Sequence, residues 1–525
     1  MPKDIILRLS PKQAADKAVY VPLAAKAAGV EASQVAFAAV SRRSVDARRG
    51  AVKVELAVQL YLDGESTPKP VHFDYPDVAR APEVAVVGAG PAGLFAALRL
   101  IERGFRPVIL ERGKEVSPRK KDIARINRNQ GVDPDSNYSF GEGGAGTFSD
   151  GKLFTRSKKR GDYDRALRTF VFHGADPAIL HDARPHIGSD RLPRVIANMR
   201  KTITDAGGTF VFGARVSDII VRNGRIAGVE WMGTAESAGS AERLDVAATI
   251  LATGHSARDI YELLHRKGIA VEAKPFAMGL RIEHPQQLID KIQYRLPERG
   301  EYLPAASYSL VAQIGGRGVY SFCMCPGGFI VPAMTHEAES VVNGMSPSGR
   351  NSPYANSGIV TEVRLADFAH LREAHGELAG LRFQQELEHA ARKAAGEGQR
   401  APAQRVADFI AGRQSSSLPK SSYVPGTVAA DLATVMPPFM TAAIRGGLAG
   451  FGRKMRGFDS NDALLLGVES RTSTPVRIPR DPATLRHPQV EGLYPTGEGA
   501  GYAGGIVSAA LDGHRVADAV ADTLK

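Results

Sequence analysis

The chain has only two cysteines, Cys323 and Cys325, in 525 residues. So few thiols exclude a disulfide framework and any zinc or iron–sulfur site built on four cysteines. No run of about 18 consecutive apolar residues occurs, and no apolar segment follows Met1, so we predict neither a membrane span nor a signal peptide. The expected location is the cytoplasm, where packing alone must hold the fold.

Other chemistry-bearing patterns are also missing. No Gly-x-Ser-x-Gly nucleophile elbow is present. His173, His181 and His186 are close in sequence, but their spacing matches no metal-binding face of a helix, so we predict no metal site. The net charge of +11 could attract nucleic acid. Because basic clusters are usually solvated faces, nucleic acid is not the expected partner.

The length and composition indicate several domains of ordinary composition, because 525 residues exceed what one hydrophobic core can hold. Alternating apolar patterns and a proline-rich stretch near residues 68–76 suggest a small N-terminal module followed by a linker. From Glu83 onward the order strand, glycine turn, helix, strand predicts an α/β fold with a parallel Rossmann-type sheet, an inserted β-meander and a second, mixed α+β domain. The expected parts are a small α+β module at 1–79, a nucleotide-binding domain at 80–269, a substrate-side domain at 270–485, and a return to the nucleotide-binding domain at 486–525. Within them the apolar patterns predict helices over residues 11–28, 192–206 and about 365–396, and a β-meander over residues 209–231.

The first motif that carries chemistry is Gly88-Ala-Gly90-Pro-Ala-Gly93, which follows an apolar strand and opens a helix. The first glycine permits a tight turn, the second lets a pyrophosphate approach the backbone, and the third allows helix and strand to pack closely. The N-terminus of the helix adds N–H donors and a positive dipole. The next apolar strand ends in Glu111, about twenty residues on, where an acid meets ribose hydroxyls. Together these features predict an adenine dinucleotide.

Two later segments resemble the cofactor signatures of the two-dinucleotide-binding-domain flavoproteins of the glutathione reductase structural superfamily. They are Thr249–Gly254, a strand that ends in Ala-Thr-Gly, and Gly492–Gly499, in which Glu498 stands where most relatives carry Asp. The resemblance implies FAD, with Glu498 on the ribityl chain and the backbone of Val216 at the adenine. The cofactor-binding residues so predicted are Gly88, Gly90, Pro91, Ala92, Gly93, Glu111, Arg112, Gly143, Gly144, Val216, Ala252, Thr253, Gly254, Gly497, Glu498, Gly505 and Ile506.

Nearly the whole chain is similar to bacterial proteins described as FAD-dependent, or NAD(FAD)-utilising, dehydrogenases. The residues behind this resemblance are Gly141–Leu153, Asn351–Gly358, Glu469–Val476 and the C-terminal block. It implies an oxidoreductase that moves a hydride through flavin N5 between a substrate or NAD(P)H and a second acceptor. Because no second Gly-x-Gly-x-x-Gly directly follows a predicted strand after residue 120, NAD(P)H is a candidate only as a transient reductant.

Several interpretations stay open. Gly141–Leu153 is either a loop against the cofactor or a flexible surface loop. Arg471, among hydroxyl residues, either binds a substrate carboxylate or the flavin edge, or is a surface arginine. With one residue between them in a strand, Cys323 and Cys325 are expected to point to opposite faces, which favours structural thiols. His255 is the histidine expected near the cofactor.

Two alternative functions also fit the motifs. A flavin monooxygenase or an alkene reductase would carry the same cofactor segments. An RNA-associated or scaffolding flavoprotein would use the basic surface and the N-terminal module to bind a partner. The substrate, electron acceptor, catalytic residues and oligomeric state do not follow from the sequence.

Overall fold

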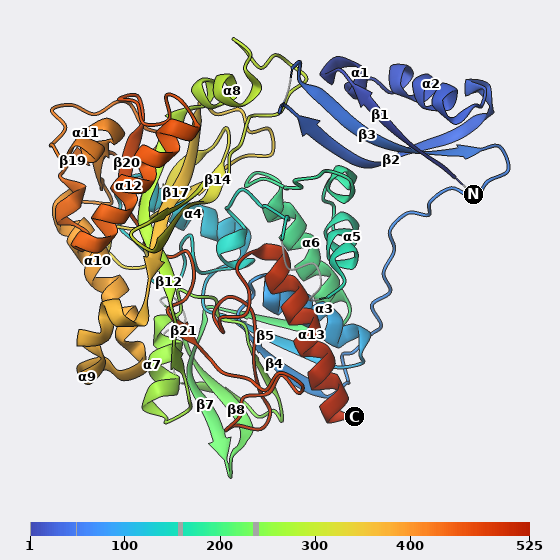
Figure 1. The fold of residues 1–525 in the computed structure, drawn as a ribbon. Coiled ribbons are helices and arrows are strands. Elements are labelled where there is room, and N and C mark those ends of the chain that lie inside the picture. Colours follow the sequence, from blue (N-terminus) through green and yellow to red (C-terminus); the bar gives the residue numbers. More distant parts are fainter. Residues whose placement is uncertain (1, 49, 156–160, 235–240) are drawn as a thin grey trace.

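A computed structural model describes residues 2–48, 50–155, 161–234 and 241–525, and Figure 1 shows their arrangement. A parallel sheet, a larger mixed sheet and a small N-terminal module form separate parts of the molecule. The predicted α/β fold class is confirmed. No helix in the described part of the chain is both long and apolar enough to cross a membrane.

The N-terminal module is a three-stranded antiparallel sheet with two helices. Its elements are β1 (Lys3–Leu9), α1 (Pro11–Ala15), α2 (Lys17–Ala28), β2 (Val35–Asp46) and β3 (Lys53–Leu62), with the strands in the order β1-β3-β2. The single helix expected over 11–28 is broken at Asp16, whose carboxylate accepts the N–H of Ala18 and caps α2. Residues 1–79 carry eleven Lys and Arg against nine Asp and Glu, so the module does not concentrate the positive charge of the chain.

The nucleotide-binding domain is built on a five-stranded parallel sheet that draws strands from distant parts of the chain. In spatial order they are β22 (Leu493–Pro495), β10 (Thr249–Leu251), β4 (Glu83–Val87), β5 (Arg106–Glu111) and β6 (Thr209–Phe212). The expectation that 209–212 belongs to the β-meander was wrong, because β6 pairs in parallel with β5. The meander itself consists of β7 (Ala214–Arg222), β8 (Arg225–Gly233) and β9 (Glu242–Leu244).

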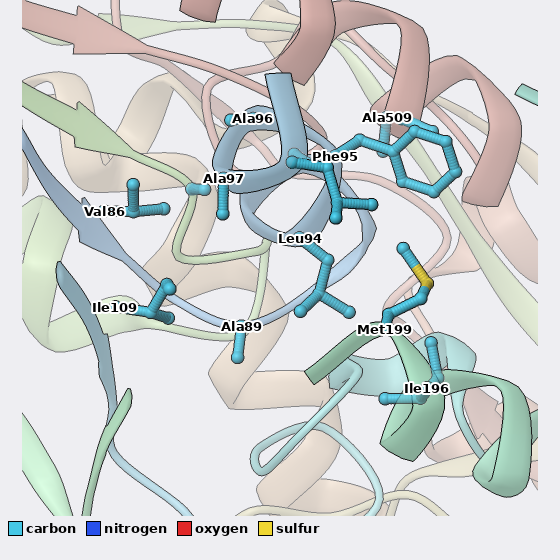
Figure 2. Close-up of a cluster of buried hydrophobic side chains, with 14 of the residues drawn as sticks. Val86, Ala89, Leu94, Phe95, Ala96, Ala97, Ile109, Ile196, Met199 and Ala509 are labelled. Carbon is cyan, nitrogen blue, oxygen red and sulfur yellow. The ribbon is translucent and has the colours of Figure 1, made fainter. Parts of the chain in front are cut away.

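Two helices pack together beside this sheet and fix the glycine turn. Helix α3 (Pro91–Glu102) lies along α13 (Ile506–Leu524), which ends the chain (Figure 1). Figure 2 shows the apolar cluster around α3, in which Phe95 lies toward Ala509 of α13, while Leu94 lies toward Met199. A side chain at Gly513 would come within 2.1 Å of the Ala92 carbonyl, so glycine is required where the two helices meet.

The second domain contains a seven-stranded sheet. Its strands are β13 (Val311–Ile314), β14 (Arg317–Cys325), β17 (Tyr354–Val363), β12 (Phe276–Pro285), β20 (Leu464–Glu469), β18 (Ala401–Arg405) and β19 (Thr427–Ala429). Helices α12 (Pro438–Lys454) and α10 (Ala379–Ala395) pack against it, and β15 (Phe329–Pro332) pairs with β16 (Val342–Met345) nearby. The helix expected from Leu365 to about Gly396 is interrupted, because Gly376 has φ +53° and ends the short α9 (Arg372–His375).

The remaining elements connect these parts. A two-stranded ribbon of β11 (Glu272–Ala273) and β21 (Val476–Arg477) lies where the chain passes between the two larger domains. The remaining helices are α4 (Val116–Asn127), α5 (Tyr163–Phe172), α6 (Leu192–Asp205), α7 (Arg258–Arg266), α8 (Gln286–Tyr294) and α11 (Val406–Ala411). Helix α6 matches the expected span of 192–206 to within one residue.

Candidate cofactor and substrate site

One cleft runs between the parallel sheet and the second domain. It holds about 1790 Å³ of space between atoms, its open mouth included. Every residue predicted from the sequence to bind the cofactor lines this cleft except Gly93 and Gly143. Segments that are about 400 residues apart in the sequence therefore meet around one space.

The glycine turn after β4 forms one end of the cleft. Gly90 is the N-terminal cap of α3 and no side chain caps that helix, so the donors of its first turn remain open for a ligand. A Cβ on Gly90 would meet only the Gly144 Cα, at 4.0 Å, and would stand in the cavity. Gly93 lies behind the turn, where a Cβ would be 2.0 Å from the Gly88 carbonyl oxygen. Its role is close packing of helix and strand, as its position in the motif predicts.

Glu111 ends β5 inside the same cleft and is 5% exposed. Its carboxylate accepts the backbone N–H groups of Ala89, Gly113 and Gly141, each at 2.9 Å. Two carboxylate oxygens have about four acceptor positions, so one remains for a ribose hydroxyl. The same side chain therefore ties the glycine turn to the neighbouring loop and offers an acceptor to the cleft.

The glycine-rich loop at 141–153 lies against the glycine turn and is not a free surface loop. The Gly143 N–H donates to the Ala89 carbonyl at 2.9 Å, which places Gly143 behind the cleft wall while Gly144 lines the cleft. Fully buried Arg119 on α4 donates to the carbonyls of Asn137, Tyr138, Glu142 and Gly144. Burial lowers the pKa of Arg119 to about 10. The sequence contained no signal for this residue, because Arg119 is one charge among many on α4.

The C-terminal segment is held by a buried acid on α13. The carboxylate of Asp512 accepts the Gly497 N–H at 2.9 Å and the Thr496 hydroxyl at 2.9 Å. Arg480 binds the same carboxylate at 2.6 and 2.9 Å. Sequence reasoning missed this pair, although an acid on an apolar helix face is a usable signal for it. The N-terminal cap of α13 is Gly505, no side chain caps the helix, and its first turn opens onto the cleft.

Glu498 and His255 lie together in the cleft wall. The Nε2–H of His255 donates to the Arg471 carbonyl at 2.8 Å, and its Nδ1 lies 3.5 Å from the Glu498 carboxylate. Arg112 also lines the cleft, but its guanidinium binds Asp135 and Asp259 and stacks on Phe140. It shapes the wall next to Glu111, and its charge is already balanced.

The structure excludes the interpretation of Arg471 as a surface arginine. Its side chain is 4% exposed, and its guanidinium binds Glu339 at 2.6 Å, Glu388 at 3.3 Å and the Thr335 hydroxyl at 3.0 Å. Arg258 completes the cluster by binding both glutamates. Arg471 is therefore not a surface residue. It lines the cleft, and Glu339 and Glu388 balance its charge together with that of Arg258. Its contribution is to hold the strand end that carries Thr472 into the cleft.

The two cysteines do not lie on opposite sides of the strand, as was expected. The pairing of β14 with β17 shifts register between Phe322 and Cys325, and Cys323 has φ +42°. Residues two positions apart in a strand point to the same face, and both cysteines line the same cleft although the bulge distorts the strand between them. Cys323 is exposed to the cavity although protein surrounds it, and desolvation there raises the pKa of its thiol. The prediction that they face opposite sides was wrong.

The donors in the cleft fit a dinucleotide cofactor. Two uncapped helix N-termini, a gap that only glycine leaves open at position 90, and an acidic acceptor at Glu111 are the groups that pyrophosphate and ribose require. The fold and the site therefore define a dinucleotide-binding α/β protein with a second domain over the cofactor cleft.

Comparison with known proteins specifies this class as flavoprotein. Residues 81–128 match an FAD binding domain family, and residues 275–472 match the family described as FAD-dependent protein, C-terminal domain-like. Residues 1–61 match a domain of unknown function. An uncharacterized protein of Clostridium beijerinckii is 38% identical over 501 residues, which are 91% of each chain. The chain belongs to the family of that protein.

More distant similarities concern parts of the chain or its general arrangement. Thiamine thiazole synthase of Pyrobaculum calidifontis is 31% identical over 168 residues, and the match spans 31% of this chain and about half (49%) of that enzyme. The solved structure of a geranylgeranyl bacteriochlorophyll reductase-like protein from Thermoplasma acidophilum is 13% identical with a TM-score of 0.36, covering 84% of this chain and 78% of that one. The predicted FAD-binding flavoprotein family is confirmed, whereas membership of the glutathione reductase superfamily stays a prediction.

Proposed function

We propose that the protein is an FAD-dependent dehydrogenase or reductase that acts on a substrate held between the cofactor cleft and the second domain. The observation that carries the proposal is that the open N-termini of α3 and α13 line one cleft, which continues to the wall formed by β14 and β16. When bound, FAD supplies a ring that exchanges two electrons as a hydride at N5.

Different residues along the cleft would bind different parts of the cofactor and the substrate. The first turn of α3 would bind the pyrophosphate, Glu111 a ribose hydroxyl, and Glu498 the ribityl chain. The first turn of α13 would donate hydrogen bonds to the flavin edge or the pyrophosphate. The second domain would exclude water and position the substrate. NAD(P)H would reach the flavin only transiently, through the same open mouth.

The test is to purify the protein, identify the released flavin after denaturation, and add NADH and then NADPH without oxygen. Bleaching of bound FAD by either nucleotide would make the protein a nicotinamide-driven reductase. FAD that bleaches only with an organic substrate would make it a substrate dehydrogenase. Failure to hold FAD after reconstitution, or failure of every reductant tried, would contradict the proposal.

A further inference from the structure

The substrate end of the cleft is the part lined by Lys152 and by residues of β14 and β16. The side chains in and directly behind its wall carry one more positive charge than negative charge. Lys152 from the glycine-rich loop lines the cleft there, and two more cations, Arg281 from β12 and Arg350 from the loop before β17, lie behind its wall. Two carboxylates face them, Asp150 and Glu469. Burial together with Arg350 lowers the pKa of nearby His186, which keeps that ring neutral.

Both carboxylates already have arginine partners. Arg350 binds Asp150 with two hydrogen bonds, at 2.7 and 3.2 Å. Arg281 binds Glu469 at 3.0 Å, and its other donors reach Asn356 and the Cys323 carbonyl, both at 2.9 Å. One carboxylate therefore balances the charge of each of these two arginines.

Lys152 is left as the surplus cation. Its Nζ lies 3.6 Å from the Asp150 carboxylate, beyond hydrogen-bond distance, and 3.5 Å from the Cys325 sulfur, a weak acceptor. The side chain is 36% exposed and lines the cleft. Burial opposes its charge, yet Asp150 and the two thiols raise the pKa of Lys152, so the ammonium persists. A charge in a cavity is costly unless a partner balances it.

We propose that the substrate-side pocket binds an apolar monocarboxylate whose carboxylate faces Lys152. The apolar walls beside it, from Phe148, Phe322, Val331 and Ala333, suit an apolar body. A single surplus charge matches one carboxylate, whereas a phosphate monoester carries nearly two negative charges. This inference names the substrate class and rests on the proposed function, because the cofactor occupies the rest of the cleft.

The experiment titrates the full chain, loaded with FAD, with benzoate, phenylacetate and decanoate, each against its neutral amide, and with phenyl phosphate. Binding is followed by calorimetry and by the change in flavin absorption. The variants are Lys152→Met, Lys152→Arg and, as a control, Lys114→Met. Lys114 has similar side-chain exposure, 34%, and pairs with Asp122 and Asp133 outside the cleft.

At least one acid should bind the native chain tenfold or more tightly than its amide and than phenyl phosphate. Lys152→Met should weaken that acid at least tenfold and leave the amide unchanged. Lys152→Arg should retain most of the affinity, and Lys114→Met should retain all of it. If no acid binds, or if Lys152→Met binds the acid as the native chain does, the inference is wrong.

Two further outcomes separate this inference from the proposed function. If Lys152→Met alters only the reduction potential of the flavin and not the affinity for acids, Lys152 faces the flavin and the inference is wrong while the proposed function stands. If the chain holds no FAD after reconstitution, the proposed function fails. Calorimetry with the same acids then still decides whether Lys152 forms a carboxylate site.

Discussion

The two large domains hold the two ends of one cleft by different means. At the cofactor end, the wall is mostly backbone, in which glycine turns are tied by Glu111 and Asp512 to neighbouring N–H groups. At the substrate end, the wall rests on buried ion pairs such as Arg281 with Glu469. The cofactor end therefore depends on the absence of side chains at a few glycine positions. The substrate end depends on the balance of charge between residues that are far apart in the sequence and adjacent in the fold.

The largest loss of stability is expected when one member of a buried ion pair is removed. Arg281→Met leaves Glu469 buried without its partner, and removing one member of a buried pair costs about 3–5 kcal/mol. The double variant Arg281→Met/Glu469→Leu should recover most of that loss, because neither charge then remains buried. Urea denaturation measures the free energy of unfolding of both variants.

The control for this prediction is an exposed pair on α10. Arg382 and Glu386 are 4.0 Å apart and nearly half exposed, so Arg382→Met should cost less than about 1 kcal/mol. If Arg281→Met proves as mild as Arg382→Met, the second domain does not depend on buried charge and the comparison fails.

The next effect concerns the cofactor end. Gly93→Ala places a Cβ 2.0 Å from the Gly88 carbonyl oxygen, which forces α3 away from β4. We expect a loss of about 3 kcal/mol, at the upper end of overpacking costs, and a chain that no longer retains FAD. Thermal denaturation and the FAD content per chain are the measurements. A Cβ at Gly450 in α12 would have no neighbouring atom closer than 3.7 Å. Gly450→Ala should therefore leave the FAD content unchanged, and the melting temperature should stay the same or rise slightly.

These two sites also show what the sequence could and could not predict. Gly88, Gly93 and Glu111 were identifiable because the contacts of a backbone turn are local and repeat with a fixed spacing. Arg281 and Glu469 are 188 residues apart and pair only after β12 and β20 have aligned, so no local sequence pattern predicts the pair. The placement of Cys323 and Cys325 was wrong for another reason, because residues two positions apart in a strand share a face, whereas the bulge between them has no local sequence signal.

A smaller effect appears on acidification. Burial would raise the pKa of Asp150, but Lys152 and Arg350 lower it to about 2. A carboxylate with a depressed pKa in the folded state stabilises the fold above its unfolded pKa, near 4. That contribution, about 2 kcal/mol, is lost as the pH falls from about 4 to 2. The midpoint of urea denaturation, measured at pH 6, 4 and 3, should fall more steeply with decreasing pH for the native chain than for Asp150→Asn. Parallel acid slopes would show that the Asp150 pair contributes nothing.

The smallest effect is expected from the N-terminal module, which has its own hydrophobic core. It touches the rest of the chain through the backbone of Arg43, which hydrogen-bonds to His181 and Ala183, and through Val52, which is buried in the hydrophobic core of the second domain. Deleting residues 1–67 should lower the melting temperature by only a few degrees and leave FAD per chain unchanged. A truncated chain that folds but binds no FAD would extend the cofactor site into the module.

The strand order of the parallel sheet has a consequence for synthesis of the chain. Strand β22 lies at one edge beside β10, and α13 packs on α3, so residues 493–524 complete a domain that begins near residue 83. A nascent chain would make the whole second domain before the cofactor cleft could close. The inserted domain can therefore fold before residues 493–524 are made, and the complete cofactor cleft forms only after them.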